Sequence, residues 1–258
     1  MCLLLVAIDE DPRFPFVVAA NRDEHYDRPT APACFWRHSA GLLAGRDLRD
    51  GGTWLGITRS GRFAALTNVR EPIRKLDGAP SRGSLVRSYL EGAEAPDQFC
   101  DRLGDRGGAF KGFALLFGSP GDLHHVSNRG EASSSALPSG IHGLSNGPLN
   151  APWPKVTRGK AGLIRILAEG RPRPEKALFD LLEDRTVPPD ADLPDTGVGL
   201  TLERLLSPLF VITPVHGTRC STVILVDRAG RVRFEERTFD RTGRRTGRVI
   251  FDFALDQP

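Results

Sequence analysis

Two short apolar runs near the start of the chain set the strongest constraint on its fold. Residues 3–8 (LLLVAI) and 16–20 (FVVAA) are almost wholly apolar, and the segment between them (DEDPRFP) is rich in turn-forming Asp and Pro. Uninterrupted apolar runs of this length, bounded by turn residues, are typical of strands buried on both faces. We therefore predict two adjacent strands in a sheet that is covered on both sides.

The rest of the chain alternates between strand-like and helix-like blocks. In chain order, the patterns predict paired short strands in 49–68, helices in 81–103, strands in 113–128, helices in 154–206 and strands in 217–255. The connections are of the antiparallel kind. This order predicts a single domain over 1–258 of the α+β class, in which two mostly antiparallel sheets are sandwiched between helical layers.

Charge and hydropathy exclude several classes of protein. The chain has 35 basic and 32 acidic residues, and its arginines are scattered rather than clustered, which disfavours nucleic-acid binding. The run at 3–8 is too short for a membrane span, and it lacks the basic segment and cleavage site of a signal peptide. We expect a cytoplasmic protein without a membrane span.

The cysteines indicate neither a metal site nor a disulfide framework. Cys2, Cys34, Cys100 and Cys220 are widely spaced and form no CxxC or mixed Cys/His pattern. A reducing compartment suits this usage. We therefore predict no metal ligands and free thiols.

Cys2 has two interpretations. It begins a buried strand, where a cysteine often serves as a small apolar residue. Alternatively, removal of Met1 would leave Cys2 with both a thiol and a free α-amine. An α-amine ordinarily titrates at roughly 7.7 to 8.0 and a thiol near about 8.5, so that proton exchange between them is nearly balanced at neutral pH. In this second interpretation Cys2 is an N-terminal nucleophile that carries its own base.

The cluster Asn21-Arg22-Asp23-Glu24 follows the second apolar run and also has two interpretations. A charge cluster at the end of a strand is commonly a solvated turn. If the first two strands pair, however, the cluster lies beside Cys2. Arg22 would then favour the thiolate, and Asp23 would hold the terminal ammonium or orient the attacked amide.

These residues resemble the start of the NRDE family, which includes transport and Golgi organisation protein two. Further matches recur in family order across essentially the whole chain. They are GGTWLG at 51–56, LTNVRE at 66–71, SRGSLVRSYL at 81–90, GIHGLSN at 140–146, PWPKV at 152–156 and HGTRCSTVILVD at 216–227.

The layout also resembles that of the N-terminal-nucleophile amidases of the penicillin V acylase and bile-salt hydrolase group. This resemblance implies a four-layer αββα sandwich that cleaves a linear amide. The matching catalytic positions are Cys2, Arg22, Asp23, Asn68 or Asn146, and Arg219. Side-chain amides such as Asn146, with backbone N–H groups, would stabilise the oxyanion.

Four further residues are predicted to contact the substrate. They are Asn21, Glu24, Trp54 and His142. Trp54 is equally consistent with a core position, and His142 with a hydrogen-bonded structural histidine. The glycines around Trp54 fit no phosphate-binding or dinucleotide pattern and are predicted to form turns.

Two functions from different classes follow. The first is an amidohydrolase that cleaves a non-peptide amide through an acyl-thioester on Cys2 after removal of Met1, with no cofactor and a small-molecule amide or acyl ligand. The second, implied by the eukaryotic relatives, is a non-catalytic protein that binds and traffics haem, acyl-CoA or lipid. Both would use one pocket, and we favour the enzyme.

Overall fold

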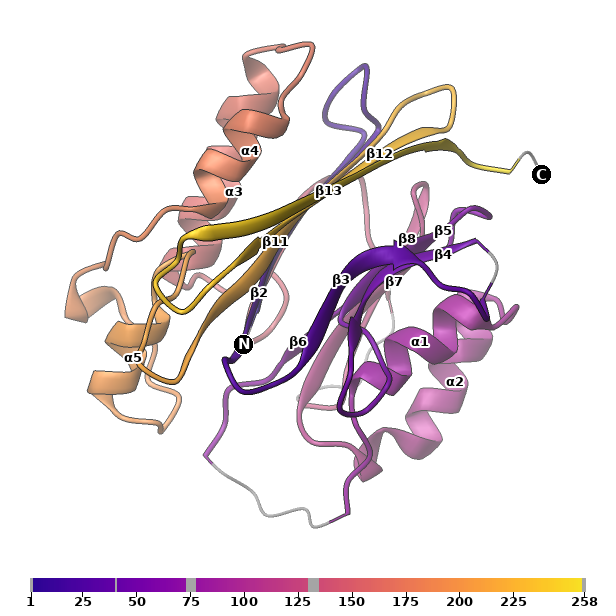
Figure 1. Ribbon diagram of the computed structural model, residues 1–258. Helices are drawn as coiled ribbons and strands as arrows, with labels where there is room; N and C mark the ends of the chain where they lie inside the picture. Colours follow the sequence, from indigo (N-terminus) through magenta and orange to yellow (C-terminus); the bar gives the residue numbers. More distant parts are fainter. Residues whose placement is uncertain (1, 40, 73–77, 130–134, 257–258) are drawn as a thin grey trace.

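The computed structural model of the chain describes residues 2–39, 41–72, 78–129 and 135–256. Two β-sheets pack face to face, and helices cover the outer face of each, so that the layers follow the order α, β, β, α (Figure 1). Every pairing between the described strands is antiparallel. The predicted α+β class and αββα sandwich are confirmed.

The first sheet holds the two N-terminal strands in its interior. Its spatial order is β10-β1-β2-β11-β12-β13. The bounds are β1 Cys2–Ile8, β2 Phe16–His25, β10 Gly140–Leu144, β11 His216–Val226, β12 Arg231–Phe239 and β13 Arg245–Ala254. β1 and β2 form a hairpin in which Cys2 lies opposite Arg22. Both strands are buried on both faces over their apolar runs, as predicted.

The second sheet comes from the first half of the chain. Its spatial order is β3-β4-β5-β6-β7-β8-β9. The bounds are β3 Thr30–Phe35, β4 Leu42–Asp47, β5 Leu55–Thr58, β6 Phe63–Asn68, β7 Phe113–Ser119, β8 Asp122–Ser127 and β9 Ser135–Ala136. The paired short strands predicted in 49–68 are β5 and β6. The edge strand β3 has no regular pattern because it contains Pro32 and a shift in register.

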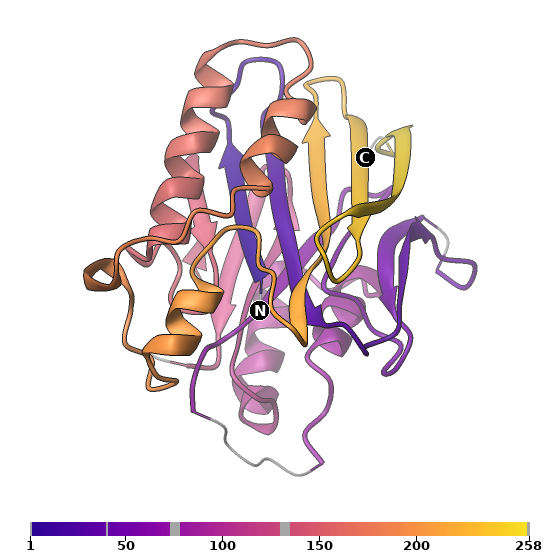
Figure 2. The ribbon, with the colours of Figure 1, turned by 60° about the vertical axis from the view of Figure 1, so that its left-hand side comes forward.

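Helices form the two outer layers. The bounds are α1 Gly83–Glu91, α2 Pro96–Arg106, α3 Pro154–Ala168, α4 Glu175–Leu182 and α5 Leu200–Leu206, with 3₁₀ turns at Gly107–Ala109 and Asp190–Asp192. α1 and α2 pack on the second sheet, where Tyr89, Phe99 and Phe117 meet. α3 and α4 cover the first sheet (Figure 2). No helix in the described ranges has the length and apolar character needed to cross a membrane.

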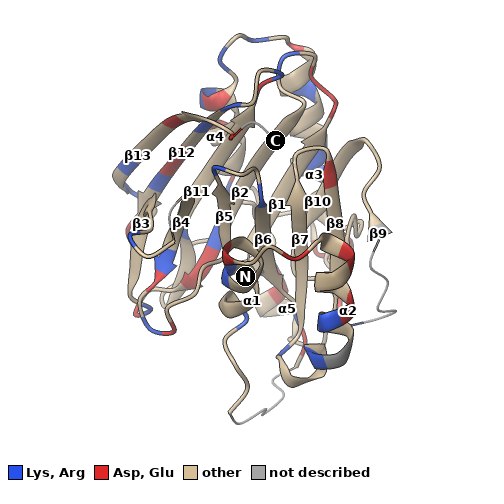
Figure 3. Ribbon diagram, turned by 90° about the vertical axis from the view of Figure 1, so that its right-hand side faces the viewer, with Lys and Arg blue, Asp and Glu red and all other residues tan. Residues whose placement is uncertain are grey.

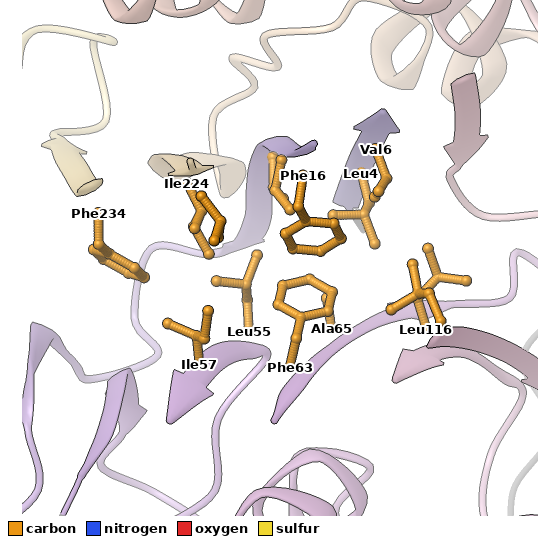
Figure 4. Packing of buried hydrophobic residues seen from close by; sticks show 14 of the residues in the cluster. Leu4, Val6, Phe16, Leu55, Ile57, Phe63, Ala65, Leu116, Ile224 and Phe234 are labelled. Atoms are coloured by element: carbon orange, nitrogen blue, oxygen red, sulfur yellow. The ribbon is translucent and has the colours of Figure 1, made fainter. Parts of the chain in front are cut away.

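The alternation of side chains along β1 and β2 divides the core into layers. Leu4 and Phe16 point between the sheets, whereas Leu3 and Val17 point toward α3 and α4. In the inter-sheet layer, the rings of Phe16 and Phe63 meet edge to face with centroids 5.3 Å apart (Figure 4). These contacts fix the spacing of the two sheets.

We expect Phe63→Ala to lower the free energy of unfolding by about 3–5 kcal/mol, because it removes a fully buried ring and leaves a cavity between the sheets. Urea unfolding followed by circular dichroism measures the change. Val215→Ala, at a side chain that is 66% exposed, is the control and should change stability by less than about 0.5 kcal/mol. Similar losses in the two variants would contradict this account of the core.

Candidate active site

Cys2 lies at one end of the sandwich, where β1 runs beside β6 of the other sheet. It shares the inter-sheet face of Leu4 and Val6, but as the first residue of its strand it is only partly buried. Its side chain lines a cavity of about 260 Å³. The described fold therefore places a free thiol at the wall of a small cavity.

The NRDE cluster forms part of β2 and is not a solvated turn. β2 continues to His25, and the exposed fractions of Asn21, Arg22 and Asp23 are 1%, 5% and 1%. Because side chains alternate along a strand, Arg22 and Glu24 point between the sheets, whereas Asn21 and Asp23 point toward the helical layer. Alternate residues of this one cluster therefore lie in two different layers of the protein.

Arg22 provides a buried positive charge on the inter-sheet face. Its neighbours across the sheet are Cys2 on β1 and Cys220 on β11. Its guanidinium lies 4.3 Å from the centroid of the Trp54 ring and 3.8 Å from a carboxylate oxygen of Glu24. Burial raises the pKa of Glu24, but nearby cations, Arg22 among them, outweigh this and hold that pKa below its ordinary value. Both Arg22 and Glu24 line the cavity.

Asp23 forms part of a buried polar cluster on the helical side. Its Oδ1 accepts a hydrogen bond of 2.7 Å from the Thr218 hydroxyl, and its Oδ2 lies 3.7 Å from the Lys155 ammonium. Burial raises the pKa of Asp23 and lowers that of Lys155. Sequence reasoning missed Lys155. Its signal was a lysine in line with Gly159 and Leu163, on the apolar stripe of the helix predicted there.

Two asparagines from different sheets meet beside Cys2. Continuing the β1–β10 register by two residues places Asn146 opposite Cys2. Asn146 is fully buried and donates a hydrogen bond of 2.7 Å to the backbone carbonyl of Asn68, which ends β6 and lines the cavity. The Ser145 hydroxyl donates to the carbonyl of Cys2 at 2.9 Å. The sequence left Asn68 and Asn146 as alternatives, and the structure brings both to the same place.

Trp54 is both a cavity wall and a core residue. It lines the cavity and packs against the inter-sheet layer. A Cβ on Gly45 would lie 2.3 Å from its ring, and a Cβ on Gly52 would lie 2.6 Å from a backbone carbon of Gly83 at the start of α1. Gly51 has a φ of 73°. Gly51 therefore forms a turn, as predicted, whereas Gly45 and Gly52 allow close approaches that the sequence did not predict.

Two further arginines line the cavity and differ in their pairing. The Nε of Arg28 donates to Asp47 at 2.8 Å. Arg82 donates to the carbonyl of Gly112 at 2.9 Å but forms no ion pair with any described residue. Lys and Arg are interspersed with Asp and Glu over the ribbon (Figure 3). Arg82 thus brings a positive charge to a cavity of mixed sign without direct contact to a carboxylate of the described part of the chain.

Arg219, predicted to be catalytic, does not line the cavity. It lies at a bulge of β11, and its Nη1 donates to the backbone carbonyls of His25 at 2.8 Å and Arg28 at 3.1 Å. These bonds hold the loop between β2 and β3. The structure therefore places the Arg219 guanidinium on the loop that carries Arg28 to the cavity, instead of beside Cys2.

Asn21 and His142, predicted to contact substrate, also lie away from the cavity. The Asn21 amide points to the helical side and donates to two backbone carbonyls at 2.8 Å each. The ring nitrogens of His142 lie 2.9 Å from the carbonyl of Pro138 and 3.2 Å from the Asn150 amide. These polar groups are buried and already hydrogen-bonded, and neither residue lines the cavity beside Cys2.

Thiol, guanidinium, carboxylate and amide groups make up the site. Within the described ranges, no three His, Cys, Asp or Glu side chains gather as a metal-binding group. The four cysteines are free thiols, with Cys34 exposed and Cys100 buried. These groups suit acyl-transfer chemistry at a thiol.

The fold is similar to that of a solved bacterial hydrolase. The C2A mutant of conjugated bile acid hydrolase from Clostridium perfringens superimposes with a TM-score of 0.54 at 10% identity, covering 99% of this chain and 92% of that one. At this identity the likeness concerns the fold alone.

The chain belongs to the Transport and Golgi organisation 2 family, whose model matches residues 1–241. Two homologues of this family are similar over nearly their whole length. The protein from Bos taurus is 35% identical and covers 92% of this chain and 93% of its own, and that from Mus musculus is 32% identical and covers 99% of each. The resemblance drawn from the NRDE, GGTWLG and related motifs is thereby confirmed.

A second buried acid lies behind the site, in the inter-sheet layer. Glu236 accepts a hydrogen bond of 2.8 Å from the backbone N–H of Ala33, and it neighbours Thr222 and Cys220. Burial raises the pKa of Glu236 to about 7. Burial likewise raises the pKa of the Cys220 thiol. Both groups are therefore protonated in the folded protein at mildly acidic pH.

Stability should fall as pH rises from about 4.5 to about 7, because in this interval folded Glu236 keeps a proton that the unfolded chain has lost. Glu236→Gln removes this dependence. Above pH 7 its free energy of unfolding should exceed that of the parent by up to about 3 kcal/mol. Urea unfolding at several pH values measures both.

The neighbouring acid is the control. Burial raises the pKa of Glu235, but hydrogen bonds from Arg248 and Arg237 outweigh this and lower it, so Glu235→Gln should instead destabilise the protein at neutral pH. If the parent and Glu236→Gln have parallel pH profiles, Glu236 does not titrate as described.

Proposed function

We propose that the protein is an amidohydrolase whose nucleophile is Cys2, exposed as the first residue when Met1 is removed. The observation that carries the proposal is that Cys2 lines one cavity with Arg22, Asp23 and Asn68, while Asn146, hydrogen-bonded to Asn68, lies opposite Cys2 in the strand register. The shared fold and the family are compatible with this activity and leave the reaction to be tested.

In the first half-reaction the Cys2 thiol attacks the carbonyl carbon of an amide. The thiol proton passes to the α-amine, and the thiolate forms the carbon–sulfur bond. The oxyanion that results needs hydrogen-bond donors. Asn146 uses one N–H of its amide on Asn68 and has a second, while the Asn68 amide makes no hydrogen bond to any described residue. The ammonium then protonates the leaving nitrogen, the carbon–nitrogen bond breaks and an acyl-thioester remains.

In the second half-reaction water hydrolyses the thioester. The α-amine, neutral again, accepts a proton from the attacking water, the carbon–sulfur bond breaks and the carboxylic acid leaves. The proton returns to the Cys2 sulfur. Asp23 and Arg22 remain charged throughout: Asp23 orients the amine, and Arg22 favours negative charge on sulfur. No cofactor enters this sequence, and four free thiols suit a reducing cytoplasm.

The order in which the cysteines react tests the nucleophile. Exposure alone predicts that an alkylating reagent modifies Cys34 first, since Cys34 is exposed and Cys2 only partly so. We expect substoichiometric iodoacetamide to modify Cys2 first, because its surroundings favour the thiolate. Intact mass and peptide mapping give the site of modification and show whether Met1 is present. Cys34→Ser is the matched control and should leave labelling of Cys2 unchanged.

The activity is tested on a panel of N-acyl amino acids and penicillin-like amides with processed protein. We expect release of the acid, and a fall of more than about 10³-fold in Cys2→Ala, which has no nucleophile. Cys34→Ser should retain full activity. Retention of Met1, or preferential labelling of Cys34 together with an uncleaved panel, would overturn the proposal.

A second candidate function rests on Arg82. Its unpaired guanidinium at the cavity suits a carboxylate or phosphate, as carried by haem or acyl-CoA. Cys2 is of a residue type that ligates haem iron. The cavity of about 260 Å³ falls below the range of about 300–1,000 Å³ typical of ligand pockets, so a macrocycle would lie largely outside it. An acyl group with an anionic head fits better.

Ligand binding without catalysis is tested with Cys2→Ala. If this second function holds, palmitoyl-CoA or haem raises the melting temperature of Cys2→Ala as much as that of the parent, and Arg82→Met abolishes the rise. Absence of stabilisation by either ligand in the parent would exclude this function. Stabilisation that depends on Cys2 would favour the enzyme.

A further inference from the structure

Lys155 occupies an energetically unfavourable position. It lies in the first turn of α3, where the helix dipole disfavours a cation, and its side chain is only 2% exposed. Desolvating an ammonium group costs several kcal/mol. Its Nζ makes no hydrogen bond to a described residue. Packing and helix stability therefore do not account for a lysine at this position.

Asp23 connects Lys155 to the nucleophile, because Asp23 and Cys2 line the same cavity and α3 packs against β1. Asp23, whose side chain is fully buried, lies 3.7 Å from its ammonium. Burial lowers the pKa of Lys155, and the negative charges of Asp23 and of the Cys2 thiolate oppose that decrease. Electrostatic interaction acts equally on both partners. An ammonium that is stabilised by the thiolate of Cys2 stabilises that thiolate in return.

The other ionisable groups near Lys155 are either paired or neutral. Arg70, in the segment after β6, forms a buried ion pair with Glu203 of α5. Burial lowers the pKa of His216 on β11 to about 3, so that it is neutral at physiological pH. Asp23, at 3.7 Å, is therefore the carboxylate that faces the Lys155 ammonium. The Arg70 cation adds to the lowering of the Lys155 pKa, whereas the Asp23 carboxylate opposes it.

We propose that Lys155 is a positioning residue for the nucleophile: Asp23 holds its ammonium beneath the start of β1, where the positive charge favours the thiolate of Cys2. This inference rests on the proposed function only in taking Cys2 as the reactive thiol. It gives a role to the PWPKV segment that the catalytic groups leave unexplained.

The test is the pH dependence of Cys2 alkylation by iodoacetamide between pH 5 and 10, quantified by mass spectrometry of the N-terminal peptide. In Lys155→Met we expect the midpoint to rise by at least half a pH unit, which makes the reaction about threefold slower at pH 7. Lys155→Arg keeps the charge and should keep the parental midpoint. Cys34, alkylated in the same samples, is the internal control and should not shift.

A structural role would lower stability without moving the midpoint, so urea unfolding is measured alongside. Lys155→Gln is a second neutral variant whose amide can still donate to Asp23. An unchanged midpoint in a folded neutral variant, or failure of both neutral variants to fold, would overturn the inference. If Cys2 reacts no faster than Cys34 in the parent, the proposed function is contradicted instead. The failure of the inference and the failure of the proposed function therefore give different results.

Discussion

The antiparallel pairing of β1 with β2 is the constraint on which the rest of the structure depends. Its register sets Cys2 opposite Arg22, and the pairing of β2 with β11 sets Cys220 on the other side of the same arginine. Because both strands are buried on both faces, a shift of one residue would turn every apolar side chain to the wrong layer. The packing of the core therefore also fixes the geometry of the site.

The same alternation explains how one short cluster serves two layers. Arg22 joins the inter-sheet layer beside Cys2, and Asp23 joins Lys155 beneath the helices. Strongly charged groups can be buried here because each faces an opposite charge or an aromatic ring. Cys2 shares the inter-sheet face with Arg22, and Asp23, on the opposite face of the sheet, lines the same cavity as Cys2.

Local patterns predicted the fold and the centre of the site well. The apolar runs at 3–8 and 16–20 became β1 and β2, and the strand registers place Arg22 and Asn146 on either side of Cys2. Other expectations depended on where a side chain points. Arg219 bonds the loop after β2, although the same residue at a regular strand position would face a different layer; the bulge in β11 decides this.

The sequence by itself determined the layered architecture, because burial on both faces and helical periodicity are properties of short segments. It also determined the family, because motifs in a fixed order can be recognised without knowing which residues are in contact. Only the tertiary structure decided that Asn68 and Asn146 meet each other beside Cys2, and that Lys155 lies against Asp23. Those contacts join residues that are far apart in the chain. The distances between them in space depend on how the two sheets and a helix pack together.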